Sequence, residues 1–293
     1  MRISILSRKS ELYSTRRLLE AAESRGHEAR VQDPFKFTIH VENPPKLLFL
    51  SKPFPLPDAV IPRIGASITY FGTALIRQFE QMGVFTLSSS RAVNASRDKL
   101  YALQLLSKQN ILLPKTAFVR RKSEILKTID EIGGAPVVIK LLEGTQGIGV
   151  VLAERLNTAQ AIIELLHVAK QNILVQKFVE EAKGRDIRAF VVGDRVVAAM
   201  RRVSENPSEF RSNVHRGGRA ESIQLPKEFE EVSVRAAKTL GLKVAGVDLL
   251  ESKEGPAIIE VNSSPGLEAI ENVSGVDIAA EIIQFIEQNV GQV

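Results

Sequence analysis

Short apolar stretches alternate with helical stretches along most of this 293-residue chain. Residues 2–6 (RISIL) are rich in β-forming residues, residues 11–26 have the apolar spacing of a helix that ends at Gly26, and residues 27–34 form a second extended run. A strand–helix–strand order of this kind implies parallel strands joined by a right-handed crossover. The sequence therefore predicts a mixed α/β (α+β) fold that begins with a βαβ unit.

The rest of the chain divides into further predicted units. An apolar run over 57–65 and a helix from about Thr73 to Met82 complete a first domain, residues 1–92. Within it, the Pro-rich stretch 43–57 is typical of loop and edge strand, and its role is not readable.

The second predicted domain, residues 93–178, begins with one or two helices and continues as strands around a Gly-rich loop. The third, residues 179–293, is rich in strands. Gly193-Asp194 is a hairpin signal there, and a last helix is expected from about Val276 to Gln288.

Composition excludes several classes of protein. The absence of cysteine rules out disulfides, thiolate metal sites and a cysteine nucleophile. Apolar runs fall short of the ~20 residues of a membrane span, and the N-terminal run is too short for a signal peptide, so a cytoplasmic protein without membrane contact is expected. The net charge of +5 suits phosphate-rich or acidic partners, but 5% aromatic content argues against nucleic-acid readout by stacking.

Acidic and amide side chains interrupt two neighbouring apolar strands near the C-terminus. Glu260 and Asn262 alternate in the stretch AIIEVN, so they share one face, and a Ser-Pro-Gly turn follows. Taken alone, this pair is more often a strand end whose polar groups are satisfied by the turn. Asp248 lies in the preceding apolar strand, which we expect to form a hairpin with the first. Three oxygen donors without His or Cys favour Mg²⁺ or Mn²⁺ over zinc.

A Gly-rich segment and two lysines point to phosphate binding. Residues 143–150 (EGTQGIGV) lack the Lys-Ser/Thr of a Walker loop and sit between strands, so they predict a hairpin flap that donates backbone N–H groups, with a plain turn as the alternative. Lys140 and Lys99 could reach phosphates as point charges, although surface lysines are the commoner case. The flap residues predicted to bind are Gly144, Thr145, Gln146 and Gly147.

The basic loop of residues 210–218 (FRSNVHRGG) carries further candidates. Arg211 could hold a transferring phosphoryl group through two hydrogen bonds, and Asn213 a phosphate or a metal-bound oxygen. His215 is a loop hydrogen-bonder or a base, and the whole loop could equally be a solvated surface.

The motifs RDKL, EGTQGIGV, DIR, FRSN, VAGVD and EVNSSPG occur in the order of the ATP-grasp superfamily. With ISILSR and AVIPRIG near the start, the chain resembles the RimK-type α-L-glutamate ligases over its whole length. The resemblance implies an N-terminal pre-ATP-grasp domain and two further subdomains that clamp ATP.

The resemblance also implies positions for the nucleotide. The backbone of Gln176, Lys177, Phe178 and Val179 would read adenine, Asp186 would lie near the ribose, and Ser212 would join Arg211 and Asn213 at the nucleotide. Arg188 would face the phosphates or the acyl substrate. Lys177 stands where relatives often have an acid, a departure that matters little if the backbone does the reading.

The implied chemistry is carboxylate–amine ligation. A carboxylate attacks the γ-phosphate of ATP, and an amine then attacks the acylphosphate. Lys99 and Lys140 would hold the α- and β-phosphates, and Arg211 would stabilise the transferred group. The metal ligands would be Asp248, Glu260 and Asn262, holding two Mg²⁺ (or Mn²⁺) ions.

By resemblance, the enzyme would add L-glutamate to the C-terminal glutamate of a small-subunit ribosomal protein, number six, or make short poly-α-glutamate, and would be a tetramer. Alternatives are another acceptor (an amino-group carrier protein, a small peptide or a cofactor tail) or a nucleotide-binding, ribosome-associated protein without turnover. A basic groove formed by Arg8, Arg63, Arg201 and Arg216 would suit an acidic, glutamate-rich acceptor.

Overall fold

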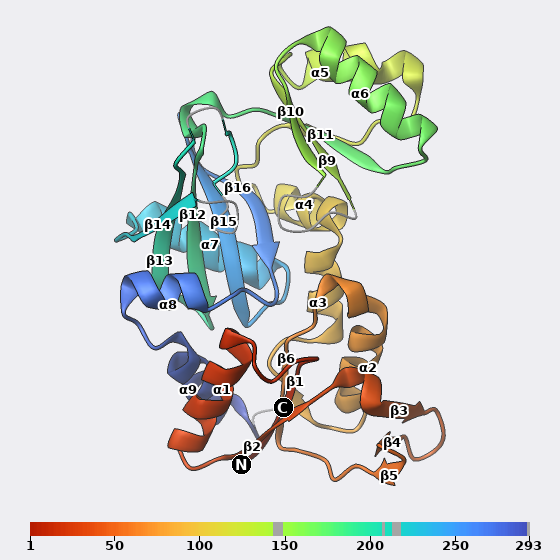
Figure 1. Cartoon of the computed structure of the whole chain (residues 1–293), viewed down its shortest axis with the longest axis vertical. Helices are drawn as coiled ribbons and strands as arrows, with labels where there is room; N and C mark the ends of the chain where they lie inside the picture. Colours follow the sequence, from red (N-terminus) through yellow and green to blue (C-terminus); the bar gives the residue numbers. More distant parts are fainter. Residues whose placement is uncertain (143–148, 207–208, 213–217, 292–293) are drawn as a thin grey trace.

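The computed structural model describes residues 1–142, 149–206, 209–212 and 218–291. Figure 1 shows the chain folding into units stacked along its long axis, each built on its own sheet. In the described part of the chain, no helix has the length and apolar character needed to cross a membrane.

The N-terminal unit contains the predicted parallel sheet, in the order β2-β1-β6-β7. Its strands are β1 (Arg2–Leu6), β2 (Glu28–Gln32), β6 (Ala59–Pro62) and β7 (Phe85–Thr86). The crossover helices are α1 (Tyr13–Ser24) and α2 (Thr69–Gln81). The βαβ prediction is confirmed, and α2 begins four residues earlier than expected.

The Pro-rich region is more ordered than the loop and edge strand expected. It forms a small antiparallel sheet of β3 (Phe37–His40), β4 (Lys46–Phe49) and β5 (Lys52–Pro53). The ring of Phe37 packs 4.9 Å from those of Phe49 and Phe54 and 5.8 Å from that of Phe79 in α2. This aromatic cluster explains why a proline-rich stretch keeps strand structure.

The central unit has a sheet in the order β10-β9-β11-β8, reached through α3 (Ser90–Arg97) and α4 (Lys99–Lys108). Alternate residues of β9 and β11 divide between two environments. Ile139 and Val175 pack under α5 and α6, whereas Lys140 and Gln176 face a cavity. The elements are β8 (Thr116–Ala117), α5 (Ile125–Glu131), β9 (Val137–Leu141), β10 (Val150–Ala153), α6 (Leu156–Val168) and β11 (Ile173–Lys177).

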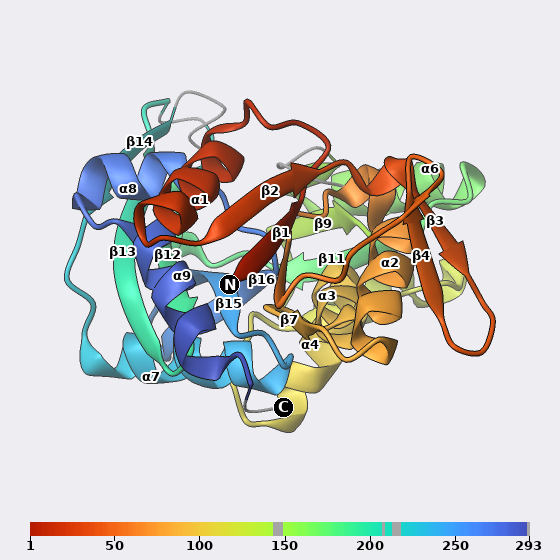
Figure 2. The same cartoon turned by 90° about the horizontal axis from the view of Figure 1, so that it is seen from below.

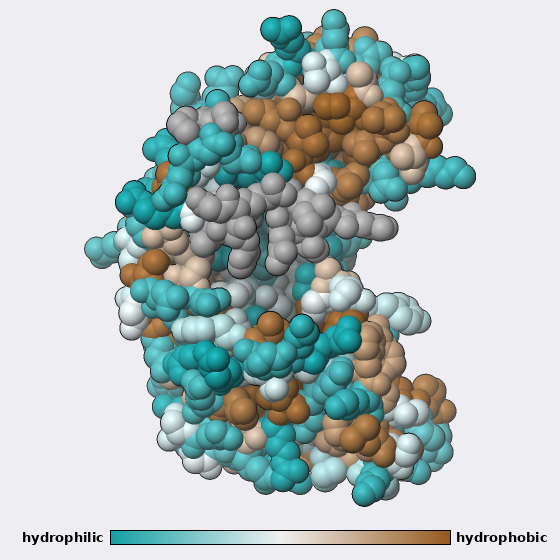
Figure 3. All heavy atoms as spheres, viewed as in Figure 1, coloured by the Kyte–Doolittle hydropathy of each residue, from teal (hydrophilic) through white to brown (hydrophobic). Residues whose placement is uncertain are grey.

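The outer surface of the central unit is apolar in places. Leu165 and Val168 of α6 are 68% and 82% exposed. Figure 3 shows hydrophobic side chains gathered over this upper unit.

The C-terminal sheet is antiparallel, in the order β14-β13-β12-β15-β16. Its strands are β12 (Arg185–Val192), β13 (Arg195–Ser204), β14 (Gly218–Ser222), β15 (Val244–Ser252) and β16 (Gly255–Asn262). The helices are α7 (Lys227–Thr239), α8 (Glu268–Ser274) and α9 (Ile278–Asn289), and short 3₁₀ turns are Pro34–Lys36, Ala66–Ile68, Lys122–Glu124 and Glu180–Ala182. The hairpin at Gly193-Asp194 is confirmed, whereas β14 and α8 were not predicted.

The two ends of the chain share one hydrophobic core. Ile5 of β1 and Leu18 of α1 belong to the same buried cluster as Ile282 and Ile286 of α9. Figures 1 and 2 both show α1 and α9 side by side. The buried carboxylate of Glu271 accepts a hydrogen bond from the Tyr13 hydroxyl at 3.0 Å. The strands of each sheet stay within one predicted domain, but this core crosses the boundaries, which remain a prediction.

Candidate active site

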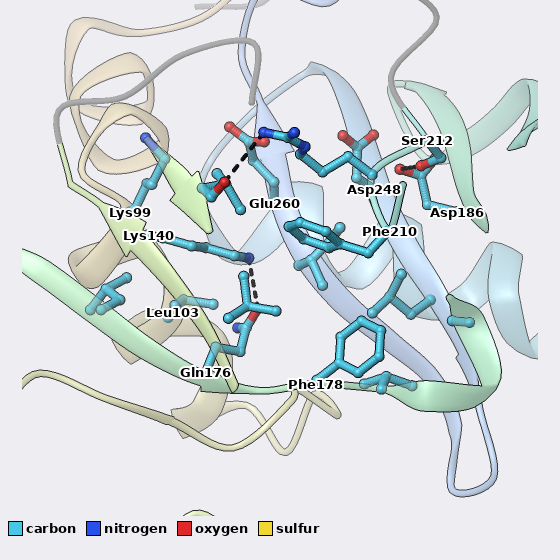
Figure 4. Close-up of a pocket in the computed structure, with 18 of the residues that line it drawn as sticks. Lys99, Leu103, Lys140, Gln176, Phe178, Asp186, Phe210, Ser212, Asp248 and Glu260 are labelled. Carbon is cyan, nitrogen blue, oxygen red and sulfur yellow. Dashed lines mark hydrogen bonds between the residues drawn. The ribbon is translucent and has the colours of Figure 1, made fainter. Parts of the chain in front are cut away.

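A cavity lies between the central sheet and the C-terminal sheet (Figure 4). One wall is the face of β9 and β11 that α5 and α6 leave uncovered, and the opposite wall comes from β12, β15 and β16. Helix α4 contributes Leu103 and Leu106 at one side. The cavity therefore collects side chains from separate parts of the sequence.

One end of the cavity is an aromatic and aliphatic slot. The rings of Phe178 and Phe210 meet edge to face at 6.2 Å, with Leu250 and Ile259 nearby in the lining. The N–H groups of the two residues before Val179 donate to protein carbonyls, whereas in the described chain the N–H of Val179 has no partner. A flat apolar slot beside one available backbone donor suits a heteroaromatic base.

Two lysines occupy the wall formed by the central unit and α4. Lys140 Nζ donates to Gln176 Oε1 at 2.6 Å, and Gln176 in turn donates to Thr116 Oγ1 at 2.7 Å. Burial lowers the pKa of Lys140 to about 8, against the opposing effect of Glu260. Burial also lowers the pKa of Lys99, whose ammonium donates to the Leu142 carbonyl at 3.1 Å. Both ammonium groups therefore favour a bound anion.

A β-bulge in β16 sets which side chains face the cavity. Asp248 pairs with Glu260 but Leu249 pairs with Ile258, so Ile259 is an extra residue. As a result Ile258 and Val261 both enter the core beneath α7, while Ile259 and Glu260 both line the cavity. Strict alternation would have put Ile258 and Glu260 on one face. The predicted Asp248–Glu260 hairpin is confirmed.

Asp248 is held by two guanidinium groups. Arg188 donates to both of its oxygens at 2.7 Å, and Arg202 lies 3.0 Å away. Burial alone would raise the pKa of Asp248, but the two arginines more than offset it and hold the pKa below its usual range. Pro265 of the Ser-Pro-Gly turn packs against Gly246, where a Cβ would lie only 2.7 Å from the proline Cβ.

Arg202 also links Asp248 to Asp186. It donates to both oxygens of Asp186, at 2.5 and 2.9 Å, and Ser212 Oγ donates to the same carboxylate at 2.5 Å. Arg188 and Asp186, predicted to meet phosphates and ribose, thus belong to one buried ion network beside the cavity.

Arg211 reaches across the cavity. Its guanidinium donates to Glu209 at 2.7 and 2.8 Å and to the carbonyl of Val150, in the central unit, at 3.3 Å. Lys177, from the predicted hinge, points elsewhere: its ammonium donates to the carbonyl of Gly133 at 2.6 Å, near the end of α5. Other predicted positions lie outside the described residues, namely Gly144, Thr145, Gln146, Gly147, Asn213, His215 and Arg216.

Known families account for this arrangement. Residues 1–93 match the model of the RimK PreATP-grasp domain, and residues 96–286 match that of the RimK-like ATP-grasp domain. The chain belongs to the RimK-like ATP-grasp family. It is accordingly an enzyme of the ATP-dependent ligase class, and its fold is the predicted ATP-grasp fold with a pre-ATP-grasp domain.

Individual relatives extend the family match. A protein of Rhodopirellula baltica named "Probable alpha-L-glutamate ligase" is 57% identical over 99% of this chain and 72% of its own. One of Shewanella frigidimarina, named "Probable alpha-L-glutamate ligase 1", is 55% identical over 99% of this chain and 96% of its own.

Solved structures share the fold at lower identity. The ATP-grasp ligase PsnB, in complex with a phosphomimetic precursor variant, Mg and ADP, has a TM-score of 0.76 at 22% identity, covering 98% of this chain and 97% of PsnB. A RimK-domain ATP-grasp protein of Sphaerobacter thermophilus has a TM-score of 0.73 at 23% identity, covering 97% and 99%.

The donor set of this ATP-grasp site fits a hard divalent cation. In the described chain no three His, Cys, Asp or Glu side chains are grouped closely enough to hold a metal by themselves. Glu260, however, forms no hydrogen bond or ion pair there, and it shares its strand face with Asn262, opposite Asp248. Oxygen donors completed by phosphates are what Mg²⁺ prefers. Glu260 and Asn262 therefore fit the ion. Asp248 would join them only by exchanging an arginine for the metal, because Arg188 and Arg202 already hold its oxygens.

Of the arginines proposed for a basic groove, Arg8, Arg63 and Arg201 lie in the described chain, and their surroundings differ. Arg8 stacks 4.6 Å over the Phe35 ring, and Arg201 pairs with Glu221 at 3.4 Å and Glu251 at 3.0 Å. Arg63 lies deep beside α3, where burial and then Arg97 lower its pKa to about 10. The charge of Arg201 is thus already compensated, whereas Arg63 has no carboxylate partner among the residues that the structure describes.

Sequence reasoning missed several residues of this site. Phe210, Ile259 and Thr116 looked like ordinary apolar or strand residues, and only the fold brings them to the cavity. Arg202 carried a usable signal, because it stands in the apolar run of β13 at a buried position.

Proposed function

We propose that this enzyme is an α-L-glutamate ligase that joins L-glutamate to an acceptor carboxylate with cleavage of ATP. The names of relatives 55–57% identical over 99% of the chain support this proposal. The observation that carries it is the opposition, across one cavity, of two partly buried lysines and the Asp248–Glu260 pair.

The arrangement favours one orientation of ATP. Adenine would occupy the slot between Phe178 and Phe210 and accept from the Val179 N–H. The phosphates would extend toward Lys140 and Lys99, and their negative charge would offset the effect of burial, which lowers the pKa of both lysines. Asp186 and Ser212 border the region between these ends.

The reaction then needs two displacements. A carboxylate oxygen of the acceptor bonds to the γ-phosphorus, and the bond to the β–γ bridging oxygen breaks with its electron pair leaving on ADP. The glutamate amine next attacks the acyl carbon of the acylphosphate, phosphate departs with the C–O electron pair, and the amine loses a proton. Two Mg²⁺ (or Mn²⁺) ions held by Glu260 and Asn262, and by Asp248 once it exchanges an arginine, would neutralise phosphate charge. Arg211 would stabilise the charge on the transferred group once it exchanges Glu209 for phosphate.

For the acceptor we propose the C-terminal glutamate of small-subunit ribosomal protein number six, with short poly-α-glutamate as a further product, in the cytoplasm and by a tetrameric enzyme. The net charge of +5 supports an acidic acceptor. An amino-group carrier protein, a small peptide or a cofactor tail would need the same chemistry.

The test is phosphate release from ATP and Mg²⁺ with each of the twenty amino acids, with and without the ribosomal protein, followed by mass spectrometry. We expect turnover that requires glutamate and products that grow in glutamate units. Turnover with a different amino acid would overturn the substrate, and ATP binding without any turnover would favour a regulatory nucleotide-binding protein.

A further inference from the structure

A second cavity adjoins the nucleotide cavity. The two share Ser96, Lys99 and Glu260 in their linings. The second is closed by Arg97, at the end of α3, and by Asn262 and Ser263, at the end of β16. A ligand here would therefore lie next to the phosphates of ATP without occupying their site.

Unsatisfied hydrogen-bond donors concentrate in this second cavity. Four buried side-chain nitrogen or oxygen atoms of the described chain lack a hydrogen-bond partner, and three of these belong to residues lining it: Arg97 Nε, Asn262 Nδ2 and Ser263 Oγ. Each of the three carries a hydrogen to donate. Buried donors without acceptors cost free energy, so their grouping indicates a missing acceptor.

Arg97, which lines the second cavity, and the neighbouring Arg63 form no ion pair with a carboxylate in the described chain. The Arg97 guanidinium donates to the carbonyl of Ile64, and this bond holds it against the end of β6. Arg63 lies next to that carbonyl in sequence and repels Arg97 electrostatically. In the described chain no carboxylate comes within 4.0 Å of either guanidinium, and Glu260 is the acid whose field reaches Arg97. Two arginines held together without a counter-charge favour an anion.

We propose that the second cavity binds the carboxylate-bearing end of the acceptor, with Arg97, Asn262 and Ser263 donating hydrogen bonds and Arg63 supplying a second positive charge. This inference rests on the proposed ligase function. Three unpaired donor hydrogens beside a guanidinium favour an anion over a cation, and two arginines match a C-terminal glutamate, which carries two carboxylates. The shared wall at Lys99 and Glu260 leaves an acceptor oxygen next to the γ-phosphate.

The experiment measures binding of L-glutamyl-L-glutamate and of its C-terminal amide by calorimetry, with Mg²⁺ and a non-hydrolysable ATP analogue present. For the unmodified enzyme we expect the amide to bind about tenfold more weakly or worse. Arg97→Gln should weaken the acid by about tenfold or more and reduce the acid-to-amide ratio below about threefold. The affinity for the ATP analogue should stay within about threefold.

Matched variants separate recognition from folding. Arg91→Gln removes an exposed arginine from the same helix and should change nothing. Ser263→Ala removes one donor with little steric change and should weaken the acid severalfold, while Arg97→Lys, which keeps the charge, should recover part of the loss. If Arg97→Gln fails to fold, the acid-to-amide affinity ratio is measured in Ser263→Ala and Arg63→Gln instead.

The proposal is overturned if Arg97→Gln and Ser263→Ala keep the unmodified acid-to-amide ratio, or if they weaken the ATP analogue rather than the dipeptide. Binding that depends on Arg97, without glutamate-dependent phosphate release, would support this site and overturn the ligase. Glutamate-dependent turnover, with dipeptide binding unchanged in Arg97→Gln, would support the ligase and overturn this site.

Discussion

The acidic side chains of the C-terminal sheet have different partners in the interior of the sheet and at its edge. In its interior, Asp248 and Asp186 are buried and each is held by arginine. At the edge strand β16, Glu260 and Asn262 face the cavities, and among the described residues neither the Glu260 carboxylate nor Asn262 Nδ2 has a hydrogen-bond or ion-pair partner. The interior is compensated by the fold itself, whereas the edge is left to be completed by ligands. Asp248 and Glu260 were both predicted as metal ligands. Neutralising the first should mainly lower stability, and neutralising the second should mainly lower activity.

The largest expected effect is at the edge. Glu260→Gln should lower kcat by roughly 10³-fold, because it removes charge that stabilises phosphoryl transfer. The free energy of unfolding should change by less than about 0.5 kcal/mol, since the carboxylate forms no hydrogen bond or ion pair in the described part of the chain. Glu254→Gln, at the exposed turn between β15 and β16, is the control. Unchanged kcat in Glu260→Gln would remove Glu260 from the site.

Asp248→Asn probes the interior. It leaves Arg188 and half of the interactions of Arg202 uncompensated, so the free energy of unfolding should fall by about 3–5 kcal/mol in urea titrations. Adding Arg188→Met should restore part of the stability, because it removes the unpaired charge. A stability loss as small as that of Glu260→Gln would contradict the contrast between interior and edge.

The charge of Lys140, on the cavity wall formed by the central unit, should make the binding of an ATP analogue depend on pH. Lys140 has a pKa of about 8 in the free enzyme, so it is an ammonium below that pH and neutral above it. Phosphates bind the ammonium, and the dissociation constant of an ATP analogue should therefore rise by up to about tenfold per pH unit above 8. Lys140→Arg, which stays charged, should remove this rise, while Lys99→Arg should retain it. A pH-independent affinity in the unmodified enzyme would contradict the role of Lys140.

Sequence reasoning reached the elements whose signals are local. The βαβ start, the Gly193-Asp194 hairpin and the pairing of Asp248 with Glu260 follow from periodicity and turn residues. The short helix α8 was missed because seven residues carry little periodicity, and β14 because it is a half-exposed edge strand. The Pro-rich sheet depends on contacts among phenylalanines distant in sequence.

The site was predictable in its residue types but not in their environments. In the sequence, Asp248 and Glu260 are both acids within apolar strands. Only the fold shows that Arg188 and Arg202 pair with Asp248, whereas Glu260 is exposed. The bulge at Ile259 leaves no mark in the sequence, because an apolar residue fits either face of the strand. Long-range pairing and register, rather than propensity, decide these features.

The smallest expected effect concerns the ion pair of Arg211, the residue whose guanidinium reaches across the cavity to Val150. Glu209 holds the guanidinium of Arg211 at 2.7 Å, and both side chains are partly exposed, at 22% and 23%. Exposed pairs of this kind contribute about 0–1 kcal/mol, so Glu209→Gln should tighten binding of an ATP analogue by at most about fivefold, because phosphates no longer compete with a carboxylate for Arg211. Glu205→Gln, an exposed acid of the same loop, is the matched control. Weaker binding in Glu209→Gln would mean that the pair orients Arg211 toward the nucleotide, so that this loop would resemble the arginine-held interior of the sheet rather than its edge.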